Sequence, residues 1–313
     1  MIMEPKNWNV YLFRDILERV EVPVNVESNK EYVQIGIRSH GKGLFYKEPV
    51  LGKALGNKQV FWIQPNCFIL NVVFAWEQAI TKTTENELGM IGSHRFPMYR
   101  PKNDLVDIDY LIYYFLTKRG TDILEAASPG GAGRNRTLGQ ERFLKSKITL
   151  PPLPEQQKIA TILSTQDKVI ELKEKLLAQK QQQKKYLMQQ LLTGKKRLPG
   201  FDRKWNYVKA NEIFKSIVDK SHGGKLEVLS STQDKGIVPR SQVDIDIKYD
   251  ENSLSTYKKV CEGDFVISLR SFQGGIEYSN YAGIVSPAYT VLRAIVKIDN
   301  GYYKQFFQEF KLH

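Results

Sequence analysis

One stretch of this 313-residue chain, between Pro151 and Gly194, limits the folds that the chain can adopt. It opens with the string PPLPEQQKIA at 151–160 and contains no proline or glycine between Pro154 and Gly194. Pro154 suits the first position of a helix, Glu155 suits its positive dipole end, and Gly194 can take the left-handed C-terminal cap. About forty residues at roughly 1.5 Å each predict a rod about 60 Å long.

The predicted helix carries an apolar stripe with coiled-coil spacing, interrupted by Lys184. One row repeats every seven residues and a second row lies beside it. Because a rod of this length cannot bury the stripe within itself, we expect the stripe to pack on another helix. The predicted helix-packing interface consists of Ile162, Leu163, Val169, Ile170, Leu176, Leu177 and Leu191.

The segments on either side of the rod share a pattern. Trp8 and Asn9 reappear as Trp205 and Asn206, at an offset of 197, and further apolar strings agree in order at offsets between 193 and 197. We therefore predict a duplicated domain, with similar domains at 1–150 and 201–313 and a spacer at 151–200. By the offset of 193, His313 corresponds to Gly120, so the second domain is expected to be incomplete at its C-terminal end.

The predicted fold class is α+β, with two similar mixed α/β domains joined by one long coiled-coil-like helix. Runs rich in valine, isoleucine and phenylalanine predict strands at 32–38, 59–63, 67–74 and 147–150. Apolar residues at helical spacing predict helices at 10–20 and 108–125. The aromatic clusters at 110–115 and 302–307 also have helical spacing, and we expect them in the core.

The net charge of +12 favours a polyanionic partner, either nucleic acid or an anionic membrane surface. The alternative is a soluble protein that is merely basic. Residues 155–204 hold twelve Lys or Arg and five Asp or Glu, so more than half of the surplus lies there. Polar residues interrupt the most apolar stretch, at 60–76, so no membrane span is predicted. The sequence begins without an apolar signal segment, and two cysteines build no disulfide framework, which predicts a cytoplasmic location.

Three glycine-containing loops carry side chains that can contact DNA. They lie at 38–43 (RSHGKG), 128–136 (SPGGAGRNR) and 268–275 (SLRSFQGG), and 233–236 is the expected counterpart of the first. Glycines allow close approach to a phosphate, and arginine can fork onto guanine. Ordinary solvated loops are the alternative interpretation. The candidate DNA-binding residues are Arg38, His40, Lys42, Arg134, Asn135, Arg136, Arg270 and Gln273.

Signatures of catalysis are missing from the sequence. It contains no phosphate loop of the form GxxxxGK[ST], no GxSxG nucleophile elbow and no methyltransferase string. The four histidines are scattered, without cysteine or carboxylate at ligand spacing, so no metal site is predicted. We expect a protein without catalytic residues or a cofactor of its own.

Several of these strings together resemble a known family. The string ITLPPLPEQQKIA at 148–160, the helix end LLTG at 191–194, the PGF at 199–201 and the restart at Trp205 are similar to the specificity subunit of type I restriction-modification enzymes. The resemblance extends over the whole chain.

The resemblance implies that each recognition domain reads one half of a split DNA target and that two helices pair antiparallel. It implies docking of modification subunits, which methylate adenine using S-adenosylmethionine, and of restriction subunits, which use ATP. A homodimer through the spacer helix is expected if that helix finds no partner within its own chain. Two other functions stay open: a coiled-coil interaction protein without a DNA role, and a stand-alone nuclease or methyltransferase-associated DNA-binding protein.

Overall fold

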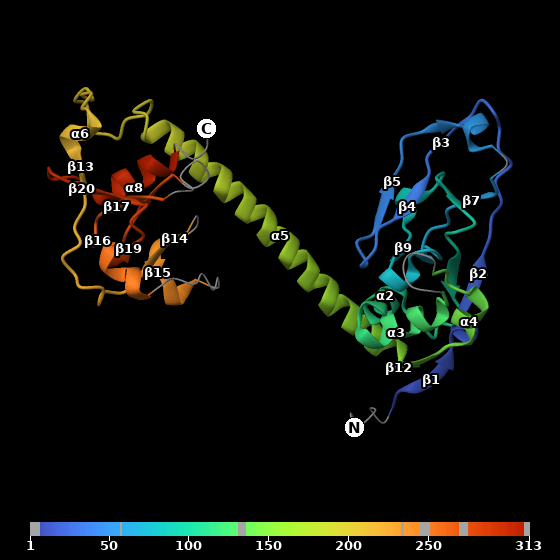
Figure 1. Ribbon diagram of the computed structural model, residues 1–313. Helices are drawn as coiled ribbons and strands as arrows, with labels where there is room; N and C mark the ends of the chain where they lie inside the picture. Colours follow the sequence, from blue (N-terminus) through green and yellow to red (C-terminus); the bar gives the residue numbers. More distant parts are fainter. Residues whose placement is uncertain are drawn as a thin grey trace. The chain divides into compact units, whose positions relative to one another are not determined.

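The computed structural model describes residues 7–56, 58–130, 136–232, 235–243, 251–268 and 275–309 (Figure 1). The chain forms two compact units, unit 1 (Met1–Lys173) and unit 2 (Glu174–His313), and their boundary falls inside the long helix α5, Leu153–Leu191. This helix of 39 residues confirms the predicted rod. The architecture is α+β, as predicted.

Unit 1 is built from short strands and a few helices around one main core. Its strands are β1 Asn9–Leu12, β2 Leu17–Val20, β3 Glu31–Tyr32, β4 Ile35–Ile37, β5 Leu44–Tyr46, β6 Val50–Leu51, β7 Val60–Trp62, β8 Phe68–Leu70, β9 Ile80–Lys82, β10 Ile91–Ser93, β11 Met98–Pro101 and β12 Lys147–Leu150. Its other helices are α1 Phe13–Ile16, α2 Ile108–Leu116, α3 Lys118–Ala127 and α4 Gln140–Lys145, with 3₁₀ turns η1 Gly52–Leu55, η2 Ala75–Glu77 and η3 Glu85–Glu87.

Unit 2 repeats this plan. Its strands are β13 Phe214–Ile217, β14 Leu229–Thr232, β15 Gly236–Pro239, β16 Lys258–Val260, β17 Phe265–Ile267, β18 Ile276–Tyr278, β19 Gly283–Val285 and β20 Thr290–Ala294. Its helices are α6 Ala210–Ile213 and α8 Asn300–Glu309, with 3₁₀ turns η4 Arg240–Gln242 and η5 Glu251–Thr256.

The central sheets of the two units have the same topology. The strand order is β2-β11-β8-β9 in unit 1 and β13-β20-β17-β18 in unit 2, with every neighbour antiparallel. Even the register agrees, since Arg100 faces Glu18 in unit 1 and Arg293 faces Lys215 in unit 2. The elements α1 and β2 map onto α6 and β13 at the offset of 197. The structure therefore contains the predicted duplication.

The core of unit 1 is a stack of phenylalanine rings between the central sheet and the helices. The ring of Phe143 lies 4.7 Å from that of Phe13 and 5.9 Å from that of Phe115, and Phe68 lies 5.5 Å from Phe115. All four side chains are fully buried. Such pairs add stabilisation beyond the burial of their area, which ties α1, β8, α2 and α4 into one body.

Two of the predicted helices are corrected by the structure. The segment 10–20 is not one helix but strand, single turn and strand, because β1 pairs with β12 and β2 pairs with β11. Its partners lie about 80 to 140 residues away, and their pairing overrides the local apolar spacing. The predicted helix 108–125 is divided at Thr117, whose side chain accepts a hydrogen bond from the Gly120 amide at the start of α3.

The start of α5 is fixed by one buried side chain, Gln156. Its Nε2 donates to the Leu105 carbonyl (3.0 Å) and to the Pro151 carbonyl (2.8 Å), and its Oε1 accepts from the Asp107 amide (3.0 Å). Gln156 is fully buried, and Ala160 one turn later is nearly so. These bonds hold α5 against the loop that leads into α2.

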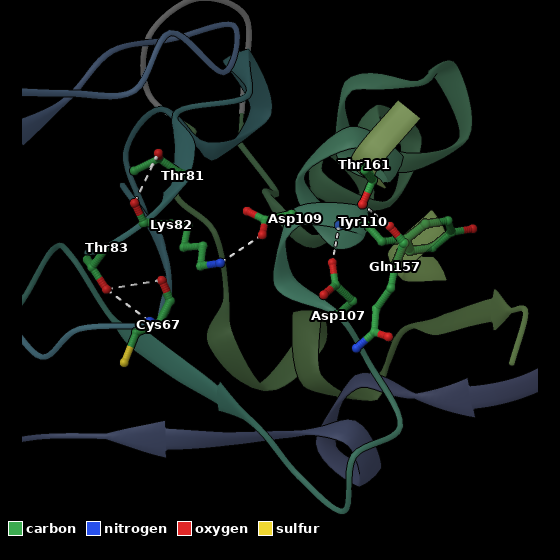
Figure 2. A network of polar contacts seen from close by, with 9 residues as sticks. All are labelled: Cys67, Thr81, Lys82, Thr83, Asp107, Asp109, Tyr110, Gln157 and Thr161. Atoms are coloured by element: carbon green, nitrogen blue, oxygen red, sulfur yellow. Dashed lines mark hydrogen bonds and ion pairs between the residues drawn. The ribbon is translucent and has the colours of Figure 1, made fainter. Parts of the chain in front are cut away.

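A second polar network supports α2 from the other side (Figure 2). The Asp107 carboxylate caps α2 by accepting from the Tyr110 amide (2.8 Å), and the Lys82 ammonium on β9 pairs with Asp109 (2.7 Å). Directly after β9, Thr83 donates to the Gln64 carbonyl and accepts from the Cys67 amide. The helix is thereby tied both to the central sheet and to α5.

Replacing Gln156 by alanine should destabilise unit 1 by about 2–4 kcal/mol, because it leaves one buried amide and two carbonyls without their partner. Urea unfolding followed by circular dichroism measures the change. Gln157→Ala is the matched control, since Gln157 is exposed on the next position of the same helix. Equal stability of the two variants would contradict this role for Gln156.

Candidate nucleic-acid interface

The segment 71–78, which follows β8, is the centre of the candidate interface in unit 1. Its turn is held by its own side chains, since Asn71 Oδ1 accepts from the Val73 amide (3.0 Å) and the Trp76 indole donates to the Val73 carbonyl (3.1 Å). Gln78 closes the turn in the left-handed region, at φ 58°. Its Nε2 donates to Thr121 Oγ1 (2.6 Å), which anchors the segment to α3.

Three other segments meet this one through backbone hydrogen bonds. The His40 amide donates to the Glu77 carbonyl (2.8 Å), and the Gly41 amide donates to the Gln78 carbonyl (2.9 Å). The Val72 amide donates to the Arg95 carbonyl (3.0 Å), and the Leu138 amide donates to the Val72 carbonyl (2.8 Å). The tip of the β4–β5 hairpin, the β10–β11 turn and the approach to α4 therefore border one surface.

The hairpin tip carries three of the predicted DNA-binding residues, Arg38, His40 and Lys42, and all three are exposed. The backbone turns through the left-handed region at His40, Gly41 and Gly43. The Arg38 guanidinium donates to the Leu44 carbonyl and lies 5.3 Å from the centre of the Phe45 ring. Arg38 is thus held in place, whereas Lys42 extends into solvent.

Arg136 reaches the same surface from a distant part of the sequence. Its guanidinium lies 5.4 Å from the centre of the Trp76 ring, a cation–π contact between partly exposed side chains. The predicted residues Arg134 and Asn135 lie outside the described residues. The structure therefore joins two loops, about a hundred residues apart in sequence, that the sequence analysis considered separately.

Two residues of this surface were missed by sequence reasoning. Arg95 lies exposed in the β10–β11 turn, beside exposed His94, and its carbonyl holds Val72. Trp76 lies in the most apolar stretch of the sequence and was not singled out. In the part of the chain that the structure describes, Arg38, Lys42, Arg95 and Arg136 form no ion pair with a carboxylate. Their charges are available for phosphates.

Glu77 is the acidic residue within the central segment. Its Oε2 accepts a hydrogen bond from the Ser39 hydroxyl (3.0 Å), which ties the carboxylate to the hairpin tip. A carboxylate at this place can accept from the exocyclic amine of cytosine or repel phosphates. The surface therefore combines four cations with one acceptor, a mixture suited to reading base edges as well as the backbone.

The corresponding surface of unit 2 is described in part. The loop after β17 corresponds to the segment after β8, and the β14–β15 turn corresponds to the hairpin tip. Arg270 and Gln273 lie outside the described residues, as do 233 and 234. No geometry is therefore assigned to these two predicted DNA-binding residues.

Among the described residues, no group of three or more His, Cys, Asp or Glu side chains is placed to hold a metal ion. Burial raises the pKa of the Cys67 thiol, against the opposing influence of Arg100, and a buried protonated thiol is a poor nucleophile. No helix in the described part of the chain is long and apolar enough to cross a membrane.

Comparison with known proteins places the chain in a family. Residues 25–181, half of the chain, match the family described as Type I restriction modification DNA specificity domain. The chain belongs to this family, which confirms the resemblance seen in the sequence.

Solved structures share the fold. The HsdS subunit from Thermoanaerobacter tengcongensis matches with a TM-score of 0.57 and 20% identity, over 98% of this chain and 80% of that chain. A chain from a structure on complex assembly and conformational transition of the type I R-M system matches with a TM-score of 0.57 and 20% identity, over 100% and 82%. The S subunit of a Type-I restriction-modification system from M. genitalium matches with a TM-score of 0.51 and 13% identity, over 100% and 79%.

Substitution of Lys42 or Arg136 by alanine should weaken binding to duplex DNA. If the side chain reaches a base edge, we expect a loss of about 1–3 kcal/mol for the preferred sequence. If it contacts a phosphate, all sequences weaken alike and the slope of log K against log salt falls by about 1. Fluorescence anisotropy at several salt concentrations measures both quantities.

The matched control is Lys145→Ala, which removes an exposed cation that is paired with Glu141 on the same helix, α4. Unchanged affinity and salt slope in both the Lys42 and Arg136 variants would remove this surface from the DNA interface.

Proposed function

We propose that this chain is the DNA-recognition and scaffold subunit of a type I restriction-modification system and recognises a specific sequence in double-stranded DNA. The observation that carries the proposal is that the loops carrying Arg38, Lys42 and Arg95 meet the segment 71–78 through backbone hydrogen bonds, while the Arg136 guanidinium packs on Trp76 of that segment. A net charge of +12 and membership of the specificity-domain family agree with it. The DNA partner in turn favours a cytoplasmic location.

The two units, with the same sheet order, support reading of a split target. Each unit would then read one half-site of the DNA. Unit 1 is the unit in which the described residues form a continuous candidate surface. The spacer helix α5 is the scaffold. Modification and restriction subunits dock on the chain and perform methylation and cleavage, while the chain itself is not an enzyme and binds no cofactor.

Competition experiments test the DNA role. The purified chain should retard duplex DNA in a gel, and a selected sequence should compete better than a random one. A coiled-coil protein without a DNA role would give no retardation at physiological salt. Isolation of the chain from its host should recover a methyltransferase subunit, identified by mass spectrometry.

Incubation of the pure chain with DNA, Mg²⁺ and S-adenosylmethionine should give neither methyl transfer nor strand cleavage. We expect this because the described residues lack a metal-binding cluster and the sequence lacks the nucleotide-binding and methyltransferase motifs. Sustained turnover by a homogeneous preparation would show that the chain is itself an enzyme. That activity would have to fall on substitution of Lys42, because the activity of a contaminant would not respond to this change.

We propose further that two copies of the chain pair antiparallel through α5. The stripe that the sequence predicts is exposed over most of its length, including Ile162, Ile170, Leu176 and Leu177. Large apolar side chains in water contribute about 1.5–3 kcal/mol each when a partner buries them fully. A two-fold axis between two copies would present identical half-sites in inverted orientation, and a palindromic split target would fit this dimer.

Light scattering on a size-exclusion column should give a mass twice the 36.1 kDa of one chain. The double variant Leu163→Glu and Ile170→Glu should give the mass of one chain, because it places charges on the stripe. Lys168→Glu changes the charge on the exposed helix outside the stripe and should leave the dimer intact. A monomer at tens of micromolar, unchanged by the double variant, would contradict the pairing.

A further inference from the structure

Glu77 places a carboxylate on a surface whose neighbouring loops carry arginine and lysine side chains. Among the described residues, Glu77 forms an ion pair with none of these cations. Its Oε2 accepts from the Ser39 hydroxyl (3.0 Å), and its Oε1 accepts from no other described residue. A carboxylate beside DNA repels phosphates, so attraction of the DNA backbone does not explain this side chain.

The backbone around Glu77 is fixed on both sides. Glu77 ends the 3₁₀ turn η2, where its amide donates to the Phe74 carbonyl (3.0 Å), and that carbonyl also accepts from the Ala79 amide (3.1 Å). The Glu77 carbonyl accepts from the His40 amide of the hairpin tip (2.8 Å). Ala75 of the same turn is fully buried, whereas Glu77 is partly exposed. A carboxylate on such a support keeps its position, as recognition of a base requires.

The hydroxyl of Ser39 orients the carboxylate of Glu77. Because the hydroxyl bonds Oε2, Oε1 is the more available acceptor for a ligand that approaches from solvent. Ser39 lies between Arg38 and His40 on the hairpin tip. The loop that presents predicted DNA-binding side chains therefore also sets the orientation of the acceptor.

The major-groove edges of the four bases differ in how well they bind a carboxylate. Cytosine presents the amino group N4, a hydrogen-bond donor, and next to it only a carbon with its hydrogen. Adenine presents an amino group beside the acceptor N7, guanine presents two acceptors, and thymine presents an acceptor and a methyl group. Because acceptors repel a carboxylate, cytosine is the base that a carboxylate favours.

We propose that Glu77 is a specificity-determining residue that accepts a hydrogen bond from N4 of one cytosine in the major groove, with Ser39 as its positioning residue. This inference rests on the DNA-recognition function proposed above and adds the base: unit 1 requires a C·G pair in its target. The carboxylate lowers the affinity for DNA in general and raises it only where that cytosine stands. Glu77 thus gives specificity by repulsion as well as by attraction.

The variant Glu77→Gln separates these two effects in the full chain. It removes the charge, so binding to random duplex DNA should become about two- to fivefold tighter. Its amide oxygen can still accept from Ser39, which turns the NH₂ group toward the base, so binding to the duplex that the unaltered chain selects should become about tenfold weaker. Fluorescence anisotropy measures both affinities. Glu48→Gln removes an exposed carboxylate beyond β5 and should change each affinity less than about twofold.

A modified base tests the contact itself. N4-methylcytosine still pairs with guanine but carries a methyl group where cytosine offers its major-groove donor. Placed in turn at each fixed C·G pair of the selected duplex, it should weaken binding of the unaltered chain by about tenfold at one pair. The Glu77→Gln chain should lose less than about twofold at that pair, because two changes to one contact are not additive. Ser39→Ala should reduce the discrimination to about threefold, and Ser39→Thr, which keeps the hydroxyl, should restore it.

Circular dichroism establishes that each variant folds. Equal losses of the Glu77→Gln and unaltered chains at every modified pair, or equal weakening of random and selected duplexes by Glu77→Gln, would overturn the cytosine contact and leave DNA recognition in place. A selected target without a fixed C·G pair would also overturn it. Absence of DNA binding by the unaltered chain would instead refute the proposed function, and the cytosine contact with it.

Discussion

The burial of Gln156 is the constraint on which the junction between unit 1 and the long helix depends. A primary amide offers two donors and an acceptor with two lone pairs, and here it bonds the Pro151 and Leu105 carbonyls and the Asp107 amide. Each of these groups lies outside the helices and strands, where no regular backbone ladder pairs it. The string PPLPEQQ is therefore more than a helix start. It carries the side chain that joins α5 to the loop before α2, and α2 in turn carries the phenylalanine stack.

Elements that depend on local signals are the ones that the sequence predicts best. The long helix was predicted almost to its bounds, because proline and glycine frame it and nothing interrupts it. The duplication was also predicted, and the common sheet order confirms it. The prediction of a helix at 10–20 is wrong, because the conformation of this segment depends on strands β11 and β12 far along the chain. A pattern of Phe13, Ile16 and Leu17 fits a helix and also fits a turn between two strands.

The candidate interface illustrates the same limit. Arg38, His40, Lys42 and Arg136 were predicted from loop composition, but their convergence requires the β8–β11 pairing that brings the segments together. Trp76 was not predicted because it lies in an apolar stretch, and Arg95 was not predicted because its turn carries no motif. The aromatic cluster at 110–115 was expected in the core, and Tyr110 and Phe115 are buried there. Its counterpart at 302–307 instead lines an open cavity, because burial depends on a covering segment as well as on spacing.

The two equivalent sheets differ in the partner of one arginine, and this difference changes the charge that each sheet presents. In unit 2 the Arg293 guanidinium binds the buried carboxylate of Asp264 through two bonds of 2.7 Å, and this contact raises the pKa of Arg293 further. At the offset of 197, Asp264 corresponds to Cys67, a neutral buried thiol, while Arg100 occupies the position of Arg293. The arginine charge is therefore cancelled by a carboxylate in unit 2, whereas in unit 1 the exposed Arg100 retains it. Because the backbone ladder is the same, exchanging one residue beneath the sheet changes the surface potential of a unit without changing its fold.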